Sequence, residues 1–258
     1  MIYARFEWRG SVRYGRMRSA GGTRIEVLMG NPIEGDAALD GRAVDAGEVR
    51  MLAPLVPGKI VAVGRNYGDH IAETGMGAPV VPRLFFKPPS SVIGPAEPIV
   101  YPGQSRQVEH EAELAVVIGR TARKVSPEQA LRHIFGYTCG NDVTARDIQK
   151  ADGQPSWAKA FDTFCPLGPV IATGLDPTGL DVSCHVNGTL TQHANTSLML
   201  MSVADLVAYI SAAVTLEPGD VILTGTPAGV GPITPGDEVA VTIAGVGTLR
   251  NPVVSGSQ

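Results

Sequence analysis

Apolar residues occur along this chain in short runs broken by glycine and proline, a pattern typical of β-strands rather than long helices. Three such runs lie near the N-terminus: Ile2–Phe6, Val12–Tyr14 and Thr23–Leu28. The turn-forming sequence Pro-Leu-Val-Pro-Gly then occupies residues 54–58. We therefore predict a small β-rich N-terminal domain over residues 1–56 and a larger domain over residues 57–258.

The larger domain shows the same strand pattern, together with signals for helices and a hairpin. Buried strands are predicted at Lys59–Gly64, Arg83–Lys87 and Leu114–Ile118. A helix is expected to begin at Ser126 and to end at Gly136. Ser202 is expected to cap an amphipathic helix, and Asn187-Gly188 predicts a hairpin turn.

Three alternating acids begin the stretch of residues 108–119 (Val-Glu-His-Glu-Ala-Glu-Leu-Ala-Val-Val-Ile-Gly), which ends in a continuous apolar segment. We predict one strand here, and its alternating geometry directs Glu109, Glu111 and Glu113 to one face, roughly 7 Å apart along the backbone. Two convergent carboxylates at this spacing can share a divalent cation. Such a cation is expected because an unpaired carboxylate beside a dry core is energetically costly. The alternative is a solvated acidic strand edge, and this segment alone leaves both open.

A histidine and a glutamate three residues apart follow the strand at residues 59–64. On a helical turn His70 and Glu73 face each other, so the carboxylate can orient and polarise the imidazole. The alternative is a solvated pair on an exposed turn. The glycine-rich sequence that follows suggests that residues 68–79 form a mobile lid.

Further polar residues carry groups suited to a site, each with a structural alternative. Asp142 and Asp147 are each a metal ligand or a helix cap. Lys159 lies among apolar residues and is either snorkelling or held for an anionic ligand. Lys87 is a surface charge or an anion contact. Thr226 lies in a loop of small residues that would let the backbone approach a ligand, and this loop lacks the Lys-Ser/Thr ending of a phosphate loop.

Composition narrows the range of partners. The net charge of −4 gives no electrostatic reason to expect nucleic acid or an anionic membrane. No apolar stretch approaches the roughly 18 residues of a transmembrane helix, and arginines interrupt the N-terminus where a secretory signal would need an apolar run. Three scattered cysteines without metal-site spacing suggest buried thiols in a reducing compartment. We expect a cytoplasmic protein.

Taken together, the motifs of residues 57–252 resemble those of the fumarylacetoacetate hydrolase family. The matching segments, in family order, are Val63-Gly64-Arg65-Asn66-Tyr67 with His70 and Glu73, Phe86-Lys87-Pro88, Glu111-Ala112-Glu113-Leu114, Gly140–Asp147, Lys159–Thr163 and Leu223–Pro227. The resemblance implies an α+β fold, a mixed β-sandwich roll or barrel of the fumarylacetoacetase C-terminal type with a small β-rich N-terminal domain. It also implies a homodimer.

A divalent metal held by Glu111, Glu113 and Asp142 is a further implication of the resemblance. Carboxylates are hard oxygen ligands, which suit Mg²⁺ and also Mn²⁺ or Ca²⁺. Glu109 lies outside the family's Glu-x-Glu pair, and three carboxylates already exceed the charge of a dication. We therefore do not expect Glu109 to be a ligand.

The substrates implied by the resemblance are small anionic 2-oxo or 2,4-dioxo acids and their enols. Their carboxylate and 2-oxygen would chelate the metal, which then stabilises an enolate. In this hypothesis His70 moves the proton, Glu73 orients His70, and Lys159 stabilises negative charge that develops on an oxygen. The residues expected to bind the substrate are Arg65, Asn66, Tyr67, Lys87, Arg146, Gln149, Gly225 and Thr226.

The reaction itself stays open between several outcomes at this stage. The chain is similar to 2-hydroxyhepta-2,4-diene-1,7-dioate isomerase-like and acylpyruvate hydrolase-like members, which implies an isomerase or hydrolase of aromatic catabolism. Oxaloacetate decarboxylation is the alternative within the family. A non-catalytic protein that binds a metal or a small acid is the alternative of another class, and the His70–Glu73 pair argues against it because binding alone needs no proton-transfer dyad.

Overall fold

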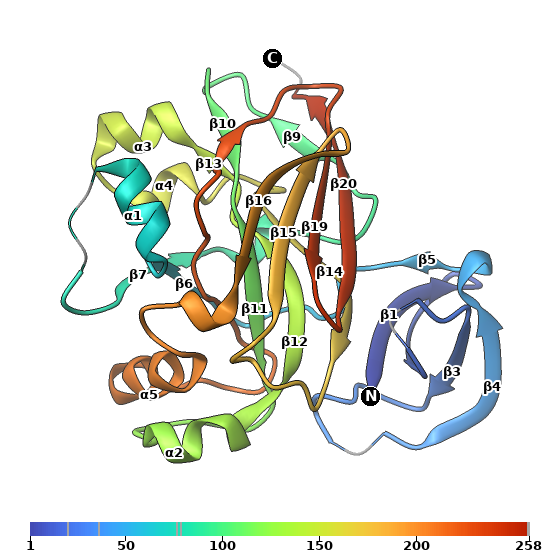
Figure 1. Ribbon diagram of the computed structural model, residues 1–258. Coiled ribbons are helices and arrows are strands. Elements are labelled where there is room, and N and C mark those ends of the chain that lie inside the picture. The colour runs from blue at the N-terminus through green and yellow to red at the C-terminus, as the bar shows by residue number, and fades with distance from the viewer. Residues whose placement is uncertain (20, 36, 76, 78, 257–258) are drawn as a thin grey trace.

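The computed structural model describes residues 1–19, 21–35, 37–75, 77 and 79–256, and consists mainly of β-strands (Figure 1). The strands are β1 (Ile2–Trp8), β2 (Ser11–Met17), β3 (Arg24–Leu28), β4 (Leu39–Asp45), β5 (Arg50–Met51), β6 (Ile60–Gly64), β7 (Arg83–Lys87), β8 (Val92–Ile93), β9 (Ile99–Tyr101), β10 (Val108–His110), β11 (Ala112–Ile118), β12 (Ile134–Asn141), β13 (Thr144–Ala145), β14 (Cys165–Ala172), β15 (Asp181–Val186), β16 (Thr189–Asn195), β17 (Val221–Leu223), β18 (Gly231–Pro232), β19 (Glu238–Ile243) and β20 (Gly247–Ser255). The α-helices are α1 (Gly68–Thr74), α2 (Pro127–Ala130), α3 (Arg146–Asp152), α4 (Pro155–Ala158) and α5 (Val203–Ala213), and short 3-10 helices lie at Ala46–Glu48, Pro89–Ser91, Leu131–His133 and Thr196–Leu198. None of the helices in the described part of the chain is long and apolar enough to cross a membrane.

The N-terminal strands form an antiparallel series, β4-β3-β2-β1, and lie at the right of Figure 1. The three runs predicted near the N-terminus are confirmed as β1, β2 and β3, whereas the sequence pattern did not indicate β4. The series joins the rest of the protein through β1, which pairs with β14 at Ile2 and Ala172. These strands therefore continue the largest sheet of the molecule, whose order is β4-β3-β2-β1-β14-β12-β11-β17-β6-β7.

The central strand β11 organises the core. It pairs with β12 on one side and β17 on the other, and each of its residues from Ala112 to Ile118 is buried. Burial on both faces explains why this stretch is continuously apolar after Glu113. β17 in turn pairs in parallel with β6, so the strand that precedes the His70 helix lies two strands from the strand that carries Glu113.

A second sheet of five strands, β16-β15-β19-β20-β9, packs against β11, β12 and β14. Its hairpin between β15 and β16 turns at Asn187 and Gly188, which both have positive φ values of 51° and 78°. These values are those of the type I′ turn that an Asn-Gly pair favours, so the predicted hairpin is confirmed. The helix capped at Ser202 is also confirmed, because α5 begins there with a capping box completed by Asp205.

Two predictions about individual elements are wrong. The acidic stretch does not form one strand, because β10 ends at His110 and belongs to a three-stranded sheet, whereas β11 begins at Ala112 in the largest sheet. Glu111 lies at the break. Gly136 does not end a helix but lies inside β12, where a Cβ atom would come within 2.5 Å of the Ala172 oxygen. Its absent side chain serves close strand packing rather than a helix end.

Candidate active site

Three buried carboxylates converge where β10, β11 and β12 meet. Glu111 lies between β10 and β11, Glu113 is on β11, and Asp142 follows β12 directly. The Asp142 amide donates to the Glu111 carbonyl oxygen at 2.9 Å, which holds the two strand ends together. One ligand atom from each of the three side chains lies within 4.8 Å of the others, so the prediction that they lie together agrees with the geometry.

Three cations pack against two of these carboxylates. Lys159 Nζ lies 2.8 Å from Glu111 Oε2 and 2.5 Å from Asp142 Oδ2, and Lys87 Nζ lies 2.6 Å from Asp142 Oδ1. Arg146 pairs with Glu111 as well. Burial by itself would raise the pKa of Glu111, but Lys159 and then Arg146 outweigh burial and hold that pKa well below its usual range. The negative charges of Glu111 and Asp142 are therefore compensated by cationic side chains of the protein itself.

Glu113 differs from its two neighbours. Within the described residues it forms no ion pair, and its Oε2 accepts a hydrogen bond of 2.7 Å from the Gly225 amide. Burial first, and then the charges of Asp142 and Glu111, raise the pKa of Glu113 well above its usual range. A cation between the three carboxylates would lower the pKa of Glu113 again, because it would stabilise the charged form of the carboxylate.

The donor set fits a hard divalent metal ion. Oxygen ligands from carboxylates are those that Mg²⁺, Mn²⁺ and Ca²⁺ prefer. Glu111, Glu113 and Asp142 would supply three of them and leave further coordination positions for water or a ligand. Glu109 does not belong to this set, because its carboxylate pairs with Arg146 Nε at 2.7 Å. The second aspartate considered, Asp147, also lies elsewhere, where it accepts hydrogen bonds from Ser105 and the Arg106 amide.

The predicted His–Glu pair is present on α1. His70 Nδ1 lies 3.5 Å from Glu73 Oε2, and the His70 side chain is largely buried while the Glu73 side chain is partly exposed. Both Glu73 oxygens also accept from the Gly229 amide at 3.2 Å, which ties α1 to the loop after β17. Of the expected lid, residues 76 and 78 lie outside the described residues, and the lid stays a prediction.

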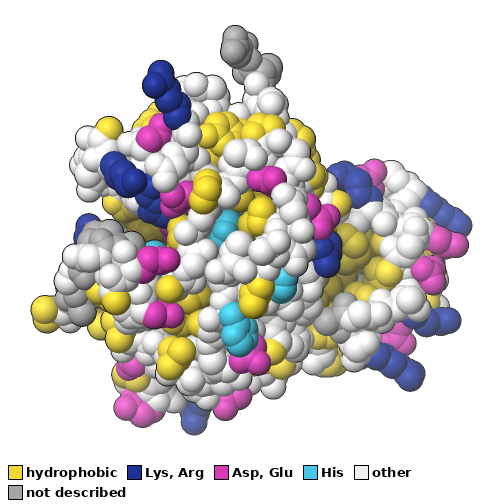
Figure 2. Space-filling view, turned by 45° about the horizontal axis from the view of Figure 1, so that its top comes forward, with side chains coloured by type: hydrophobic (Ala, Val, Ile, Leu, Met, Phe, Trp, Pro, Cys, Tyr) yellow, Lys and Arg dark blue, Asp and Glu magenta, His cyan; other side chains and the backbone are white. Residues whose placement is uncertain are grey.

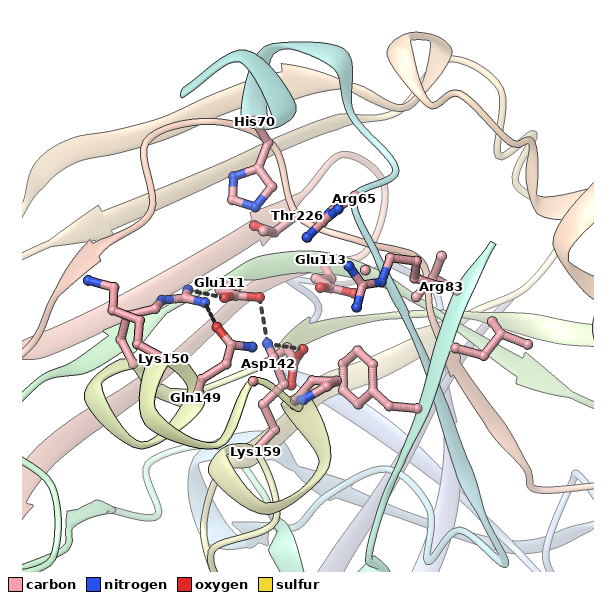
Figure 3. A pocket seen from close by; sticks show the side chains of 17 residues that line it. Arg65, His70, Arg83, Glu111, Glu113, Asp142, Gln149, Lys150, Lys159 and Thr226 are labelled. Carbon is pink, nitrogen blue, oxygen red and sulfur yellow. Dashed lines mark hydrogen bonds and ion pairs between the residues drawn. The ribbon is translucent and has the colours of Figure 1, made fainter. Parts of the chain in front are cut away.

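One cavity of about 390 Å³ connects the carboxylates with His70. Figure 3 shows His70 above the cavity, the carboxylates at its floor, and Gln149 and Lys150 at one side. In the space-filling view, Lys and Arg side chains gather beside a hollow at the left, where α1 and α3 lie (Figure 2). The predicted site residues that line the cavity are Arg65, His70, Glu111, Glu113, Asp142, Arg146, Gln149, Lys159 and Thr226.

Other residues predicted to bind substrate lie behind the cavity wall. Lys87 is buried against Asp142, and the Gly225 amide faces Glu113. Asn66 bonds with its side chain to backbone atoms of Thr224 and Met201. These residues hold the elements that form the cavity rather than lining it.

Tyr67 is also held in the interior. Its side chain is fully buried, and its hydroxyl oxygen has no hydrogen-bond partner among the described residues. Burial, and next the Glu113 charge, raise the pKa of Tyr67 far above its usual range. The phenol is therefore neutral and packs behind the carboxylate cluster.

The sequence did not single out four residues that the structure brings to this site. The Thr144 hydroxyl donates a hydrogen bond to Glu111 and accepts one from Lys159. Arg83 and Lys150 line the cavity. Gln192, on β16, is buried and donates to the Thr226 hydroxyl at 2.8 Å. Thr144 lies in one of the recognised motifs, and Arg83 and Lys150 lie close to predicted site residues without being part of a motif. Gln192 is distant in sequence from every motif, and no local pattern marks it.

Comparison with known proteins identifies the family. The family model described as fumarylacetoacetate (FAA) hydrolase C-terminal matches residues 59–254. The chain belongs to the fumarylacetoacetate hydrolase family. A second model, Rv2993c-like N-terminal, matches residues 1–54. The family resemblance and the α+β fold that it implied are thus confirmed.

Relatives within the family carry different names. The crystal structure of 2-hydroxyhepta-2,4-diene-1,7-dioate isomerase from Mycobacterium marinum is 45% identical, with a TM-score of 0.92 and 100% of both chains covered. Human oxaloacetate tautomerase FAHD2A, mitochondrial, is 44% identical over 80% of this chain and 70% of its own length. Maleylpyruvate hydrolase from Sphingobium sp. SYK-6, solved with manganese(II) and pyruvate, is 34% identical with a TM-score of 0.82, and both chains are fully covered.

Proposed function

We propose that this protein is a divalent-metal-dependent isomerase that moves a proton in small anionic 2-oxo acids or their enols, with activity like that of 2-hydroxyhepta-2,4-diene-1,7-dioate isomerase. The observation that carries the proposal is the shared cavity, which places His70 and the carboxylates Glu111, Glu113 and Asp142 around one space. The Mycobacterium marinum relative at 45% identity is named an isomerase and the human relative at 44% a tautomerase, and both names describe the relocation of a proton.

The carboxylate cluster would hold a metal such as Mg²⁺ or Mn²⁺, which acts as a Lewis acid on the oxygens of a bound 2-oxo acid. Mn²⁺ accompanies pyruvate in the maleylpyruvate hydrolase structure. In this chain Arg146 and Gln149 line the cavity beside Glu111, where they would bind the carboxylate of the acid. Lys159, held by Glu111 and Asp142, places its ammonium where it stabilises negative charge on a substrate oxygen.

In this proposal His70 is the residue that transfers the proton. Because Nδ1 faces Glu73, the other ring nitrogen, Nε2, is the one that takes the proton from carbon and returns it. Glu73 keeps the ring in orientation and stabilises its protonated form. The Gly229 amide in turn fixes Glu73, so the dyad depends on the loop after β17.

Hydrolysis of an acylpyruvate is the second candidate, supported by the likeness to maleylpyruvate hydrolase. The same residues would serve it, with a water molecule as nucleophile. Oxaloacetate decarboxylation needs the same cation and is the third outcome to be tested. The homodimer, the two-domain division and the cytoplasmic location stay predictions.

Product analysis separates these reactions. The protein is incubated with Mg²⁺ and, in turn, a 2-hydroxy-diene dioate, an acylpyruvate and oxaloacetate, each with a chelator control. We expect an unchanged product mass and a chelator-sensitive change in the ultraviolet spectrum of the diene. Two smaller fragments from the acylpyruvate would show hydrolysis, and loss of CO₂ from oxaloacetate would show decarboxylation. No turnover despite bound metal would favour a binding protein and contradict the proposal.

A further inference from the structure

The cations around the cavity divide into two groups. Arg146 and Lys159 pair directly with carboxylates of the cluster. Arg65 and Arg83 also line the cavity, but they come from the β6–β7 side rather than from α3 or α4. Figure 3 shows both arginines across the cavity from Lys150. Cations therefore line the cavity on two sides, beside the carboxylate cluster and on the β6–β7 side.

The backbone brings these two arginines together. Arg83 begins β7 and is the cross-strand partner of Gly64, the last residue of β6, and Arg65 follows immediately. Arg65 has a positive φ of 62°, a conformation that is unfavourable for a residue with a side chain and is often found at functional sites. The pairing of β6 with β7 thus brings Arg65 next to Arg83, and their side chains lie near each other in Figure 3.

The two positive charges of Arg65 and Arg83 repel each other. Arg65 is partly buried, and burial first and then the charge of Arg83 lower the pKa of Arg65. Within the described residues Arg83 forms no ion pair with a carboxylate. An anion placed between two guanidinium groups would relieve their repulsion and accept charge-assisted hydrogen bonds from both.

The wall of the cavity also includes apolar groups, Val63, Leu84 and Phe85. A ligand that spans the cavity therefore meets polar groups at the carboxylate cluster, an apolar wall, and cations on the β6–β7 side. This arrangement matches a short acid with a charged group at each end.

We propose that Arg65 and Arg83 form a second anion subsite, which binds the far carboxylate of a dicarboxylic 2-oxo acid. Arg83 is then the residue that selects diacids over monoacids of the same length. This inference rests on the proposed function, because the first carboxylate of the substrate must bind at the metal and its neighbours.

Matched ligand pairs test the subsite with the complete chain and Mn²⁺. The pairs are 2-oxoglutarate with 2-oxopentanoate and 2-oxoadipate with 2-oxohexanoate, which differ only in a terminal carboxylate or methyl group. Oxalate serves as a probe of the first carboxylate site alone. Dissociation constants are measured by calorimetry for the wild type, Arg83→Gln and Arg83→Lys. Lys150→Gln is the matched control, because Lys150 lines the same cavity from α3.

We expect the wild type to bind at least one diacid roughly 10-fold to 100-fold more tightly than its monoacid, as charge-assisted hydrogen bonds would produce. Arg83→Gln should remove this preference while oxalate and the monoacids bind as before. Arg83→Lys should keep part of it, and Lys150→Gln should keep it in full. Equal binding of diacid and monoacid at both lengths would overturn the inference, as would an equal loss of preference in Lys150→Gln. If oxalate shows no metal-dependent binding, the proposed function fails, and the inference fails with it.

Discussion

The backbone amide of Gly225 donates a 2.7 Å hydrogen bond to Glu113 Oε2, so the loop after β17 holds one carboxylate of the cluster in place. Gly225 has a φ of 98°, and a Cβ atom there would lie 2.7 Å from Asn66 Cβ. A side chain at this position would displace the loop. The orientation of Glu113 therefore depends on a residue that reaches it only through the fold.

Replacing Glu113 should weaken metal binding. Glu113→Gln removes one of three carboxylates, and we expect the Mn²⁺ affinity to fall by at least roughly 100-fold, more than outer-shell changes usually cost. Isothermal titration with MnCl₂ measures this. Glu109→Gln is the matched control, because Glu109 lies on the same acidic stretch but pairs with Arg146 instead. An unchanged affinity in Glu113→Gln would show that the cluster does not hold the metal.

Replacing His70 should separate catalysis from metal binding. His70→Asn removes the group that moves the proton, so kcat should fall by roughly 100-fold to 10,000-fold. The Mn²⁺ affinity should stay unchanged, since His70 is not one of the three clustered ligands. His193→Asn, on the exposed side of β16, is the control and should keep full activity. Wild-type turnover in His70→Asn would exclude the dyad.

Replacing Gln192 should destabilise the fold. Its oxygen accepts from the Ala112 amide at 2.9 Å, and its amide donates to Thr226 Oγ1 and the Pro227 oxygen, both at 2.8 Å. Gln192→Leu removes all three bonds in the buried interior, although Thr226 Oγ1 keeps its bond to the Ala112 oxygen, so the free energy of unfolding should fall by roughly 1–3 kcal/mol. Urea unfolding measures the change. Gln129→Leu, at an exposed position on α2, should change it by less than about 0.5 kcal/mol, and equal stability of both variants would contradict the network.

The buried thiols should make the protein less stable at alkaline pH. Burial raises the pKa of Cys139, Cys165 and Cys184 from 9.0 to about 12. The folded protein therefore keeps thiol protons that the unfolded chain releases, so the free energy of unfolding should fall as pH rises from 9 toward 12. Urea midpoints at pH 8, 9 and 10 measure the trend. Thiol reagents at pH 8 should label the protein only after denaturation, and rapid labelling of the native protein would refute the burial.

Local signals in the sequence were enough for several elements. The Asn187-Gly188 turn and the Ser202 cap depend on residues that are close together along the chain, and both formed as expected. Gly136 was misread because glycine has two uses, and only the position of Ala172 on the neighbouring strand shows which applies. The break at Glu111 also had no local signal, because it arises where β10 pairs in one sheet and β11 pairs in another.

The candidate site shows the same division. Motif residues such as Glu111, Asp142 and Lys159 were predicted together, and the structure brings them into contact. Lys87 and Asn66 were expected to face a substrate but lie behind the cavity wall. A motif marks a residue as belonging to a site, but it does not distinguish a side chain that lines a cavity from one that supports it.

By itself, the sequence determined the strand-rich class, the family and the chemistry available, because periodicity and motif spacing are local properties of the chain. Only the tertiary structure decided that Arg83 joins Arg65, that Gln192 supports Thr226, and that cations compensate two carboxylates of the cluster while Glu113 rests on a backbone amide. The physical reason is that hydrogen bonding and electrostatic compensation act over a few ångströms in space. Residues far apart in the chain meet at that range only after the sheets have formed.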